Sequence, residues 1–372
     1  MPKKTYRAGA IGHTGYGEYG HQLHMPYQFL PFTEMVAIAD ANPEGLKKGF
    51  EESKAQRSYS DYREMLAKEN LDIVSVCPRQ SWEHEAMLTA AIEAGCHIYV
   101  DKPLATSAEE CDRIIALAEK HKVKIAVAHQ SRHVEPFITA KQMLERGDIG
   151  TLTNIIGRGK EDFRGGGEDT MVLGCHVMDA MRFFAGDPIW VSGRVTAKGR
   201  DITKADSFLP AEKNGLIAGD SINATYAFPN GVVAQFQSHA DMEKRGERWG
   251  ITLIGTEGVL AIRYGDWNRR TTLKLSKAAS VPEEANDFTL VDAPFEPAVE
   301  GSPDPATIHM PTRGNRRAIA DLLDAAEQDR QPICSARDGR WAIEMVHGIY
   351  ASHLSRTQVA LPLANRSNPL AF

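Results

Sequence analysis

Four glycines lie within nine residues near the start of the chain, directly after the apolar run Ala8–Ile11: Gly12, Gly15, Gly17 and Gly20. Glycine is required where a side chain would keep a phosphate away from backbone amides, and the unpaired amides at a helix start attract anions. The pattern G-x-G-x-x-G occurs once, at residues 15–20, three residues later than a tight strand-to-helix turn would place it. We therefore predict a dinucleotide-binding loop with two candidate registers.

One register uses the last three of these glycines, and the other uses Gly12, Thr14 and Gly17. Gly17 belongs to both. We interpret residues 13–15 as an enlargement of the loop, in which backbone amides and the Thr14 hydroxyl contact the diphosphate.

A carboxylate follows the next apolar run at the spacing expected for a ribose ligand. Asp40 comes directly after Met35–Ala39, about 20 residues beyond the glycines. Residues 41–43 carry no positive charge, and a 2′-phosphate would meet a carboxylate, so this pattern favours NAD over NADP. In the alternative interpretation, Asp40 only caps the following helix.

Short apolar runs alternate with helical patterns in the first third of the chain, which predicts parallel strands joined by helices. We expect a doubly wound Rossmann sheet with the glycines on its first strand–helix turn. The expected strands are residues 6–11, 35–39, 73–77, 97–100 and 124–128, and the expected helices are 61–67, 83–94 and 107–121.

Longer strands with short turns follow from about residue 150. The turn at residues 229–231, Pro-Asn-Gly, is a strong hairpin signal. Runs of strands with few helices predict an α+β domain with a large antiparallel sheet. We therefore predict a nucleotide-binding domain at residues 1–129 and a substrate-binding and oligomerisation domain at residues 130–372.

Composition limits the possible partners. The chain has 372 residues, 42% of them hydrophobic and 25% charged. Its net charge of -6 provides no positive electrostatic field that would attract nucleic acid. No apolar run approaches the roughly 20 residues of a membrane span. Five scattered cysteines without a C-x-x-C pair suit the reducing cytoplasm. The histidines at 13, 21 and 24 have no accompanying acid or cysteine cluster, so we expect no metal site.

Residues 94–105, Ala-Gly-Cys-His-Ile-Tyr-Val-Asp-Lys-Pro-Leu-Ala, closely resemble a signature of the glucose–fructose oxidoreductase/inositol dehydrogenase (Gfo/Idh/MocA) family, with Asp101 in place of the family's Glu. The resemblance continues in the family's order over nearly the whole chain. It includes residues 71–78 with His84, 128–133, Gly174-x-His176-x-x-Asp179, 255–260, 315–317 and 338–344.

The resemblance implies a fold and an activity. The fold is a Rossmann domain followed by an α/β domain whose open sheet face pairs subunits into a homodimer or homotetramer. The activity is NAD-dependent hydride transfer with a sugar, polyol or sugar acid.

The resemblance also implies roles for single residues. Lys102, in a cleft between the domains, would stabilise charge on the reacting oxygen, and His176 would act as general base. Without the resemblance, a surface lysine and a core histidine would explain both. The cofactor side would include Pro78, His84, Asp101, Lys102 and Gln130, and the substrate side Lys102, Asp162, Arg164, His176 and Asp179.

One departure from the family leaves the reaction open. Val172 stands where sugar dehydrogenases of this group carry an Asp, one helical turn before His176; Glu168 and Asp169 are candidate replacements. Besides a dehydrogenase, we consider an enzyme that retains NAD and uses transient oxidation for elimination, hydration or glycoside cleavage. The third alternative is a catalytically silent sensor of NAD and sugar.

Overall fold

The computed structural model describes residues 4–242, 248–265, 270–278, 287–293, 301–303, 308 and 310–372. The chain forms two compact units. The first contains Met1–His133, Ala211–Asn214 and Phe295–Arg340, and the second contains Val134–Pro210, Gly215–Pro294 and Trp341–Phe372.

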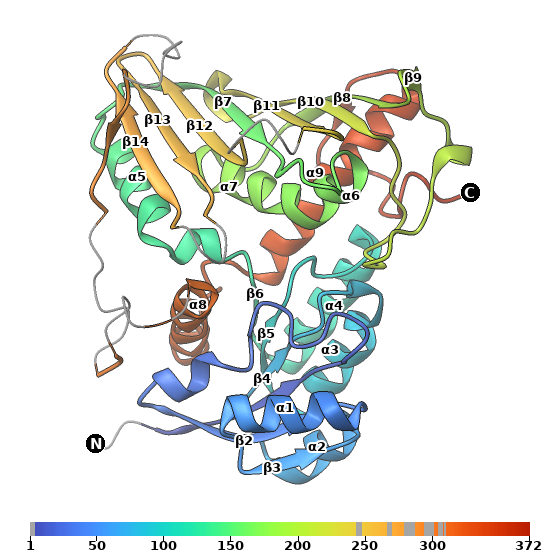
Figure 1. Ribbon diagram of the computed structural model, residues 1–372, viewed down its shortest axis with the longest axis vertical. Helices are drawn as coiled ribbons and strands as arrows, with labels where there is room; N and C mark the ends of the chain where they lie inside the picture. The colour runs from blue at the N-terminus through green and yellow to red at the C-terminus, as the bar shows by residue number, and fades with distance from the viewer. Residues whose placement is uncertain are drawn as a thin grey trace. The chain divides into compact units, whose positions relative to one another are not determined.

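The first unit contains a six-stranded sheet in which every pair of neighbouring strands is parallel (Figure 1). Its order, β3-β2-β1-β4-β5-β6, is that of a doubly wound dinucleotide-binding fold, which confirms the predicted fold class. The strands are β1 (Tyr6–Ile11), β2 (Thr33–Ala39), β3 (Arg57–Tyr59), β4 (Ile73–Val76), β5 (His97–Val100) and β6 (Ile125–Val127). The helices between them are α1 (Pro43–Ser53), α2 (Tyr62–Glu69), α3 (His84–Glu93) and α4 (Ala108–His121).

The segment after β1 differs from the prediction, because it forms a series of turns and then only a 3-10 turn at Pro26–Phe29. Gly15, Gly17 and Gly20 have φ of 94°, 101° and 53°, and a right-handed helix cannot include such values. The predicted strand–helix turn is therefore wrong. The first helix of the described chain is α1, which follows β2 and is capped by Asn42 rather than by Asp40.

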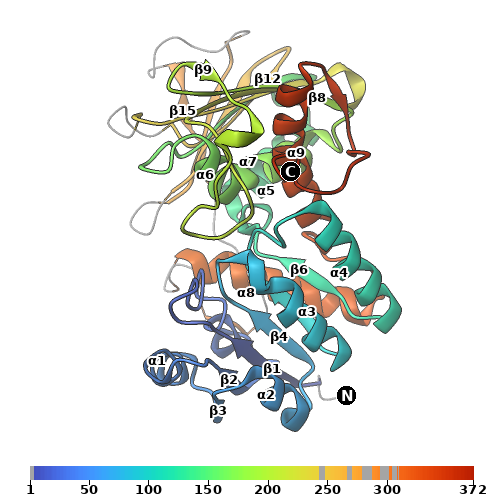
Figure 2. The same ribbon diagram turned by 90° about the vertical axis from the view of Figure 1, so that its right-hand side faces the viewer.

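The chain returns to the first unit long after residue 133. Helix α8 (Met310–Glu327) contacts β5 and β6, and its residues Ala318, Ile319, Leu322 and Leu323 join one apolar cluster with the first sheet (Figures 1 and 2). The predicted division at residues 129 and 130 did not anticipate this return. The apolar stripe of α8 is evident in the sequence, but the sequence does not show which sheet it covers.

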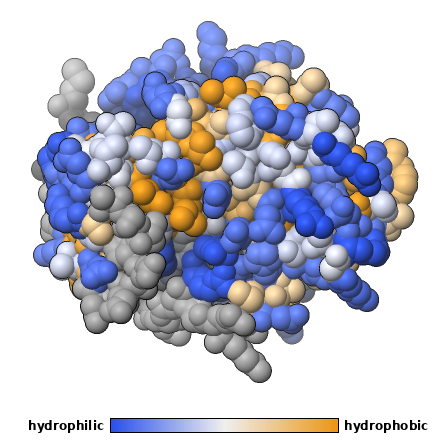
Figure 3. Space-filling view, turned by 90° about the horizontal axis from the view of Figure 1, so that it is seen from above, coloured by the Kyte–Doolittle hydropathy of each residue, from blue (hydrophilic) through white to orange (hydrophobic). Residues whose placement is uncertain are grey.

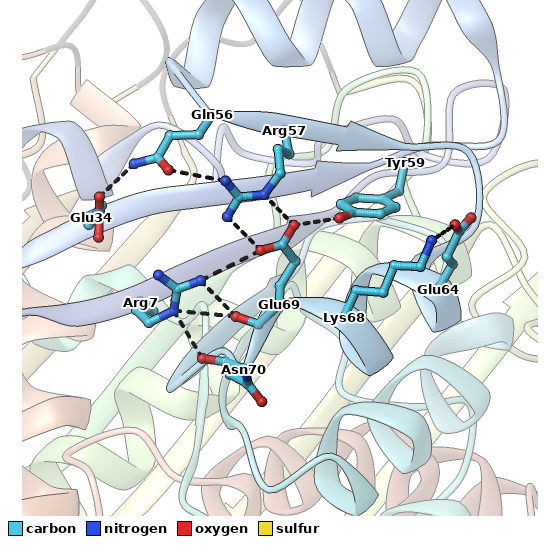
Figure 4. Close-up of polar contacts among 9 residues, drawn as sticks. All are labelled: Arg7, Glu34, Gln56, Arg57, Tyr59, Glu64, Lys68, Glu69 and Asn70. Carbon is cyan, nitrogen blue, oxygen red and sulfur yellow. Dashed lines mark hydrogen bonds and ion pairs between the residues drawn. The ribbon is translucent and has the colours of Figure 1, made fainter.

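A buried carboxylate fastens the edge strand β3 to α2 (Figure 4). Glu69, 4% exposed, accepts hydrogen bonds of 2.5 and 2.6 Å from Arg57 and one from the Tyr59 hydroxyl. Arg7 of β1 lies 3.5 Å from the same carboxylate. The hydrogen bond from Arg57 holds the pKa of Glu69 below its ordinary value. This network connects β1 and α2 to β3, whose three residues supply few ladder hydrogen bonds.

The second unit contains a 10-stranded sheet, as the predicted antiparallel domain requires. Its order is β15-β14-β13-β12-β7-β11-β10-β8-β16, with β9 paired to β8, and only β7 and β11 are parallel neighbours. The strands are β7 (Leu152–Arg158), β8 (Trp190–Ala197), β9 (Arg200–Asp201), β10 (Ser221–Ala227), β11 (Val233–His239), β12 (Gly250–Gly255), β13 (Val259–Arg263), β14 (Thr272–Ser276), β15 (Thr289–Leu290) and β16 (Val359–Ala360).

Helices cover one face of this sheet (Figures 1 and 2). They are α5 (Glu135–Glu145), α6 (Gly167–Asp169), α7 (Cys175–Ala185) and α9 (Ala336–Ser355). The residues that alternate with the core along β7, β11 and β12 point to the opposite face, and they include the half-buried Ile156, Val233 and Ile254. Figure 3 views the molecule from the side of this face and shows an apolar patch among hydrophilic residues.

Candidate functional site

The first unit contains a cavity of about 540 Å³ beside the end of β2. Its lining includes Asp40, His13 of the glycine loop, Trp82 and Glu83. Arg63 lines it as well and lies over the Tyr62 ring at 4.5 Å. Arg63 is a basic residue that the sequence analysis did not place here. We refer to this cavity as the nucleotide pocket.

Asp40 is 2% exposed and is held by the glycine loop. Its carboxylate accepts hydrogen bonds of 2.7 Å from the Thr14 hydroxyl, 3.1 Å from the Thr14 amide and 2.9 Å from the Asn42 amide. A Cβ atom at Gly45, in α1, would lie 1.8 Å from the Thr14 hydroxyl. Glycine at 45 therefore allows Thr14 to reach Asp40. The sequence analysis predicted that the Thr14 hydroxyl contacts the diphosphate. In the structure, both the hydroxyl and the backbone amide of Thr14 donate hydrogen bonds to Asp40 instead.

Close packing explains three of the four loop glycines. A Cβ atom would lie 2.4 Å from the Tyr19 ring at Gly12, 2.3 Å from the Arg79 amide at Gly17, and 2.0 Å from the Asp101 carboxylate at Gly20. Contacts this short force the neighbouring atoms to move. The need for glycine at these positions therefore does not decide between the two candidate registers of the fingerprint.

Gly15 is different, because no atom of the described residues other than its chain neighbours lies within 4 Å of the position its Cβ would take. The amides of Gly15 and Gly17 donate no hydrogen bond to any residue in the described ranges. Open space and unpaired amides are what an approaching phosphate needs. This part of the loop thus fits a dinucleotide diphosphate, and Asp40 fits its ribose hydroxyls.

Lys102 is 4% exposed, and its peptide bond to Pro103 is cis. We call the turn that contains these two residues the lysine turn, and neighbouring side chains fix it from two sides. Asp101 is fully buried, accepts a 2.8 Å hydrogen bond from the Lys102 amide, and contacts the His21 ring at 3.0 Å. Burial raises the pKa of Asp101, but His21 and Lys102 bring it below its ordinary value. Asp101 therefore connects the lysine turn to the glycine loop.

His84 and Gln130, predicted on the cofactor side, contact protein atoms. The fully buried ring of His84 bridges the carbonyl oxygens of Pro78, at 2.7 Å, and Leu104, at 3.1 Å. Gln130 donates a 2.8 Å hydrogen bond to Asn315, whose amide in turn donates to the backbone oxygen of His21 at 2.9 Å. These residues support the lysine turn and the glycine loop.

His176 lies in the second unit, at the start of α7, and is 6% exposed. Two aromatic rings lie beside it: Trp249 at 6.3 Å and Tyr264 at 6.4 Å between ring centres. These two rings stack at 4.5 Å, and the Tyr264 hydroxyl donates to the His176 backbone oxygen at 3.1 Å. Stacked aromatic faces beside a histidine make a surface for the apolar face of a ring-shaped substrate.

The loop between β7 and α6 is internally paired. Arg164 donates to both carboxylate oxygens of Asp162, at 3.1 and 2.7 Å, and Lys160 lies 3.5 Å from Asp162. Burial raises the pKa of Asp162, but the hydrogen bonds from Arg164 bring it below its ordinary value. The predicted substrate residues Asp162 and Arg164 thus bind each other.

Position 172, where sugar dehydrogenases of the family carry an Asp, lies in a π-helical turn, Thr170–Gly174, which joins α6 to α7. Val172 there is 1% exposed, so it contributes an apolar side chain to the core. Asp169 accepts hydrogen bonds from the backbone of Lys160 and Glu161 and a 2.5 Å bond from Ser238, and it therefore fixes the loop. Asp179, one turn beyond His176, is fully buried.

Sequence analysis missed Thr14 as a partner of Asp40, and it missed the aromatic pair beside His176. Trp249 directly precedes β12, and Tyr264 directly follows β13, its antiparallel neighbour. The Tyr264 amide donates to the Trp249 oxygen at 3.1 Å, as antiparallel pairing across a short turn requires. Counting outward from that turn would have placed the two rings side by side.

Two searches of the described residues gave no candidates. No helix there is long and apolar enough to cross a membrane. No group of three or more His, Cys, Asp or Glu side chains there is arranged to hold a metal ion.

Residues 9–129 match the sequence model of an oxidoreductase family with an NAD-binding Rossmann fold, GFO/IDH/MocA, and residues 137–261 match the GFO/IDH/MocA C-terminal domain. An uncharacterised oxidoreductase of Bacillus subtilis (strain 168) is 28% identical over 272 residues, 71% of this chain and 73% of that protein. A levoglucosan dehydrogenase of Pseudarthrobacter phenanthrenivorans is 24% identical over 304 residues, 74% and 77% of the two proteins. The crystal structure of an oxidoreductase domain protein from Kribbella flavida, 23% identical, has a TM-score of 0.74 and covers 97% of this chain and 100% of that chain.

Proposed function

The chain belongs to the GFO/IDH/MocA oxidoreductase family, and from that premise we propose that it transfers hydride between NAD and a hydroxyl or carbonyl carbon of a sugar, polyol or sugar acid. The observation that carries the proposal is Asp40, fixed by Thr14 at the edge of the nucleotide pocket beside the open amides of Gly15 and Gly17. The levoglucosan dehydrogenase among the relatives supports the sugar class.

The first unit supplies the cofactor side. When bound, NAD supplies the nicotinamide carbon that accepts or donates hydride. Asp40 binds the ribose hydroxyls, which disfavours a 2′-phosphate and hence NADP. The amides of Gly15 and Gly17 bind the diphosphate. Asp101 and His84 act as positioning residues that hold the lysine turn in place.

Lys102 and His176 supply the substrate chemistry. The Lys102 ammonium binds the reacting oxygen and stabilises the negative charge that develops there as the hydroxyl loses its proton. His176 takes that proton during oxidation and returns it during reduction. Trp249 and Tyr264 pack against the apolar face of the sugar. Asp179, one helical turn beyond His176, orients the His176 ring or binds a sugar hydroxyl.

Val172 favours a second candidate. A buried valine cannot orient His176 or bind a substrate hydroxyl as the family's Asp does, and this departure favours a reaction other than simple dehydrogenation. Oxidation of one carbon acidifies its neighbour, and a β-elimination, hydration or glycoside cleavage followed by re-reduction would then leave NAD unchanged.

A screen of sugars, polyols and sugar acids with NAD separates these functions. Stoichiometric NADH, followed by its absorbance, supports the dehydrogenase. Product without NADH supports the retained-cofactor enzyme, and binding without either supports a sensor. We expect Lys102→Met to lower kcat at least ~100-fold with NADH affinity preserved, whereas Lys47→Met, which removes an exposed lysine from α1, leaves kcat unchanged. An active Lys102→Met enzyme contradicts the assigned mechanism.

We also propose a homodimer or homotetramer that forms through the sheet face defined by Ile156, Val233 and Ile254. That face carries apolar side chains and no described helix.

A reducing compartment such as the cytoplasm fits the cysteines, since all five are described, all are buried, and none forms a disulfide.

A further inference from the structure

Residues Ala211–Asn214 belong to the first unit although the chain on both sides belongs to the second. Asn214 is fully buried, and its side-chain oxygen accepts a 2.8 Å hydrogen bond from the Ser81 amide. Ser81 begins the 3-10 turn Ser81–Glu83, which continues into the wall of the nucleotide pocket at Trp82 and Glu83. The segment is therefore fixed beside that pocket.

Lys213, the neighbour of Asn214, lies over two aromatic rings. Its Nζ is 5.0 Å from the ring centre of Tyr16, in the glycine loop, and 4.9 Å from that of Trp82. An ammonium over aromatic faces is attracted by the negative charge of their π systems. Lys213 also has a φ of 41°, a conformation that residues other than glycine seldom adopt and that persists where contacts impose it.

Two carboxylates close in sequence to the rings that Lys213 covers have basic partners of their own. Glu83 contacts His13, and Glu18 pairs with Arg79 at 3.2 Å. Lys213 forms no ion pair with any residue that the structure describes. Its charge is thus available to an anion that approaches the glycine loop.

The glycine loop holds the complementary donors. Tyr16, which Lys213 covers, lies between Gly15 and Gly17, whose amides donate to no described residue. A cation together with unpaired amides is the usual donor set for phosphate oxygens. The opening at Gly15 leaves space for such a group.

We propose that Lys213 binds the diphosphate of the dinucleotide and so completes the subsite that the Gly15 and Gly17 amides begin. This inference rests on the proposed function, because it takes NAD as the ligand of the first unit. The segment 211–214 thereby contributes to a site that the Rossmann motifs alone do not complete. Asn214 acts as its positioning residue.

Binding of cofactor fragments tests the inference without turnover. The affinities of NADH, ADP and adenosine are measured by calorimetry, with competition against NADH fluorescence for the weaker ligands. We expect Lys213→Met to weaken NADH and ADP about 10-fold and to leave adenosine unchanged, because adenosine lacks phosphate. The salt dependence of the NADH affinity should also fall, whereas Lys213→Arg keeps the charge and most of the affinity. Lys47→Met is the matched control, since it removes one exposed lysine from the same unit.

The outcomes separate the inference from the proposed function. If the wild type binds NADH and Lys213→Met binds NADH and ADP as tightly, the lysine inference is wrong and the proposed function stands. Equal losses for ADP and adenosine also overturn it, because they indicate a change in the pocket rather than a lost phosphate contact. A wild-type protein that binds neither NADH nor ADP contradicts the proposed function itself.

Discussion

Asp40 shows how much a single carboxylate depends on its neighbours. The sequence pattern identifies it from its spacing, yet its position comes from the Thr14 hydroxyl and amide and from Asn42. Each of these donors fixes the carboxylate before a ligand arrives. An oriented carboxylate loses less entropy on binding the ribose hydroxyls.

Thr14→Ala removes the hydroxyl that donates to Asp40, and we expect NADH affinity to fall roughly 3- to 10-fold, because a hydrogen bond to a charged group is lost. Thr14→Ser keeps the hydroxyl and should preserve the affinity. Fluorescence titration of NADH measures both variants. Equal affinities for the two variants would show that Thr14 does not position Asp40.

At the residue scale, sequence reasoning identified residue types better than contacts. Spacing made Asp40 a candidate ribose ligand, and family resemblance made Lys102 and His176 candidate catalytic residues. Sequence reasoning could not reveal that Asp162 pairs with Arg164, or that Gln130 binds Asn315. Such partners lie close only after folding, and a charged side chain has the same sequence signature whether it binds a ligand or a neighbour.

The elements were predictable where their periodicity was strong. Strand β1 has the predicted bounds Tyr6–Ile11. Helix α4 lies within the predicted range 107–121 and is capped by Ser107, whose hydroxyl accepts a hydrogen bond from the Glu110 amide at 3.2 Å. Helix α1 was missed because its fully buried positions are Gly45, Gly49 and Ser53, and only Leu46 and Phe50 add apolar side chains to the core. Those glycines instead let α1 approach the glycine loop.

Helix α9 contains a buried histidine, and we expect its protonation on unfolding to lower the stability of the second unit in acid. Neither ring nitrogen of the fully buried His347 has a hydrogen-bond partner among the residues that the structure describes, and burial lowers its pKa from 6.5 to about 4. Above about pH 6.5 the ring is neutral in both folded and unfolded chains. As the pH falls from 6.5 towards 4, only the unfolded chain gains the proton, so stability is lost over that range.

We expect the free energy of unfolding to fall by roughly 2 kcal/mol between pH 7.5 and pH 5 because of His347. His347→Leu should remove that part of the loss. Urea unfolding of both proteins at the two pH values measures it. The same loss with and without the histidine would contradict the assignment.

The assembly of whole molecules should depend on the sheet face of the second unit. A charge placed among Ile156, Val233 and Ile254 would be buried without a partner in an interface, which is costly. Ile254→Glu is therefore expected to dissociate the oligomer to a 41.0 kDa chain, as measured by light scattering after gel filtration. Ile333→Glu, a change at a residue 46% exposed in the first unit, is the control. An unchanged mass for Ile254→Glu would exclude this face as the interface.

Because α8 packs against the first sheet but lies far from it in the sequence, that sheet is synthesised well before the helix that covers it. Strand β6 leaves the ribosome early, but the helix that completes the same apolar cluster ends at Glu327. The roughly 180 residues between them take on the order of 10 to 40 s to translate. During that interval the nascent first sheet exposes apolar side chains, so the growing chain presents a surface that chaperones can bind before the second unit is complete.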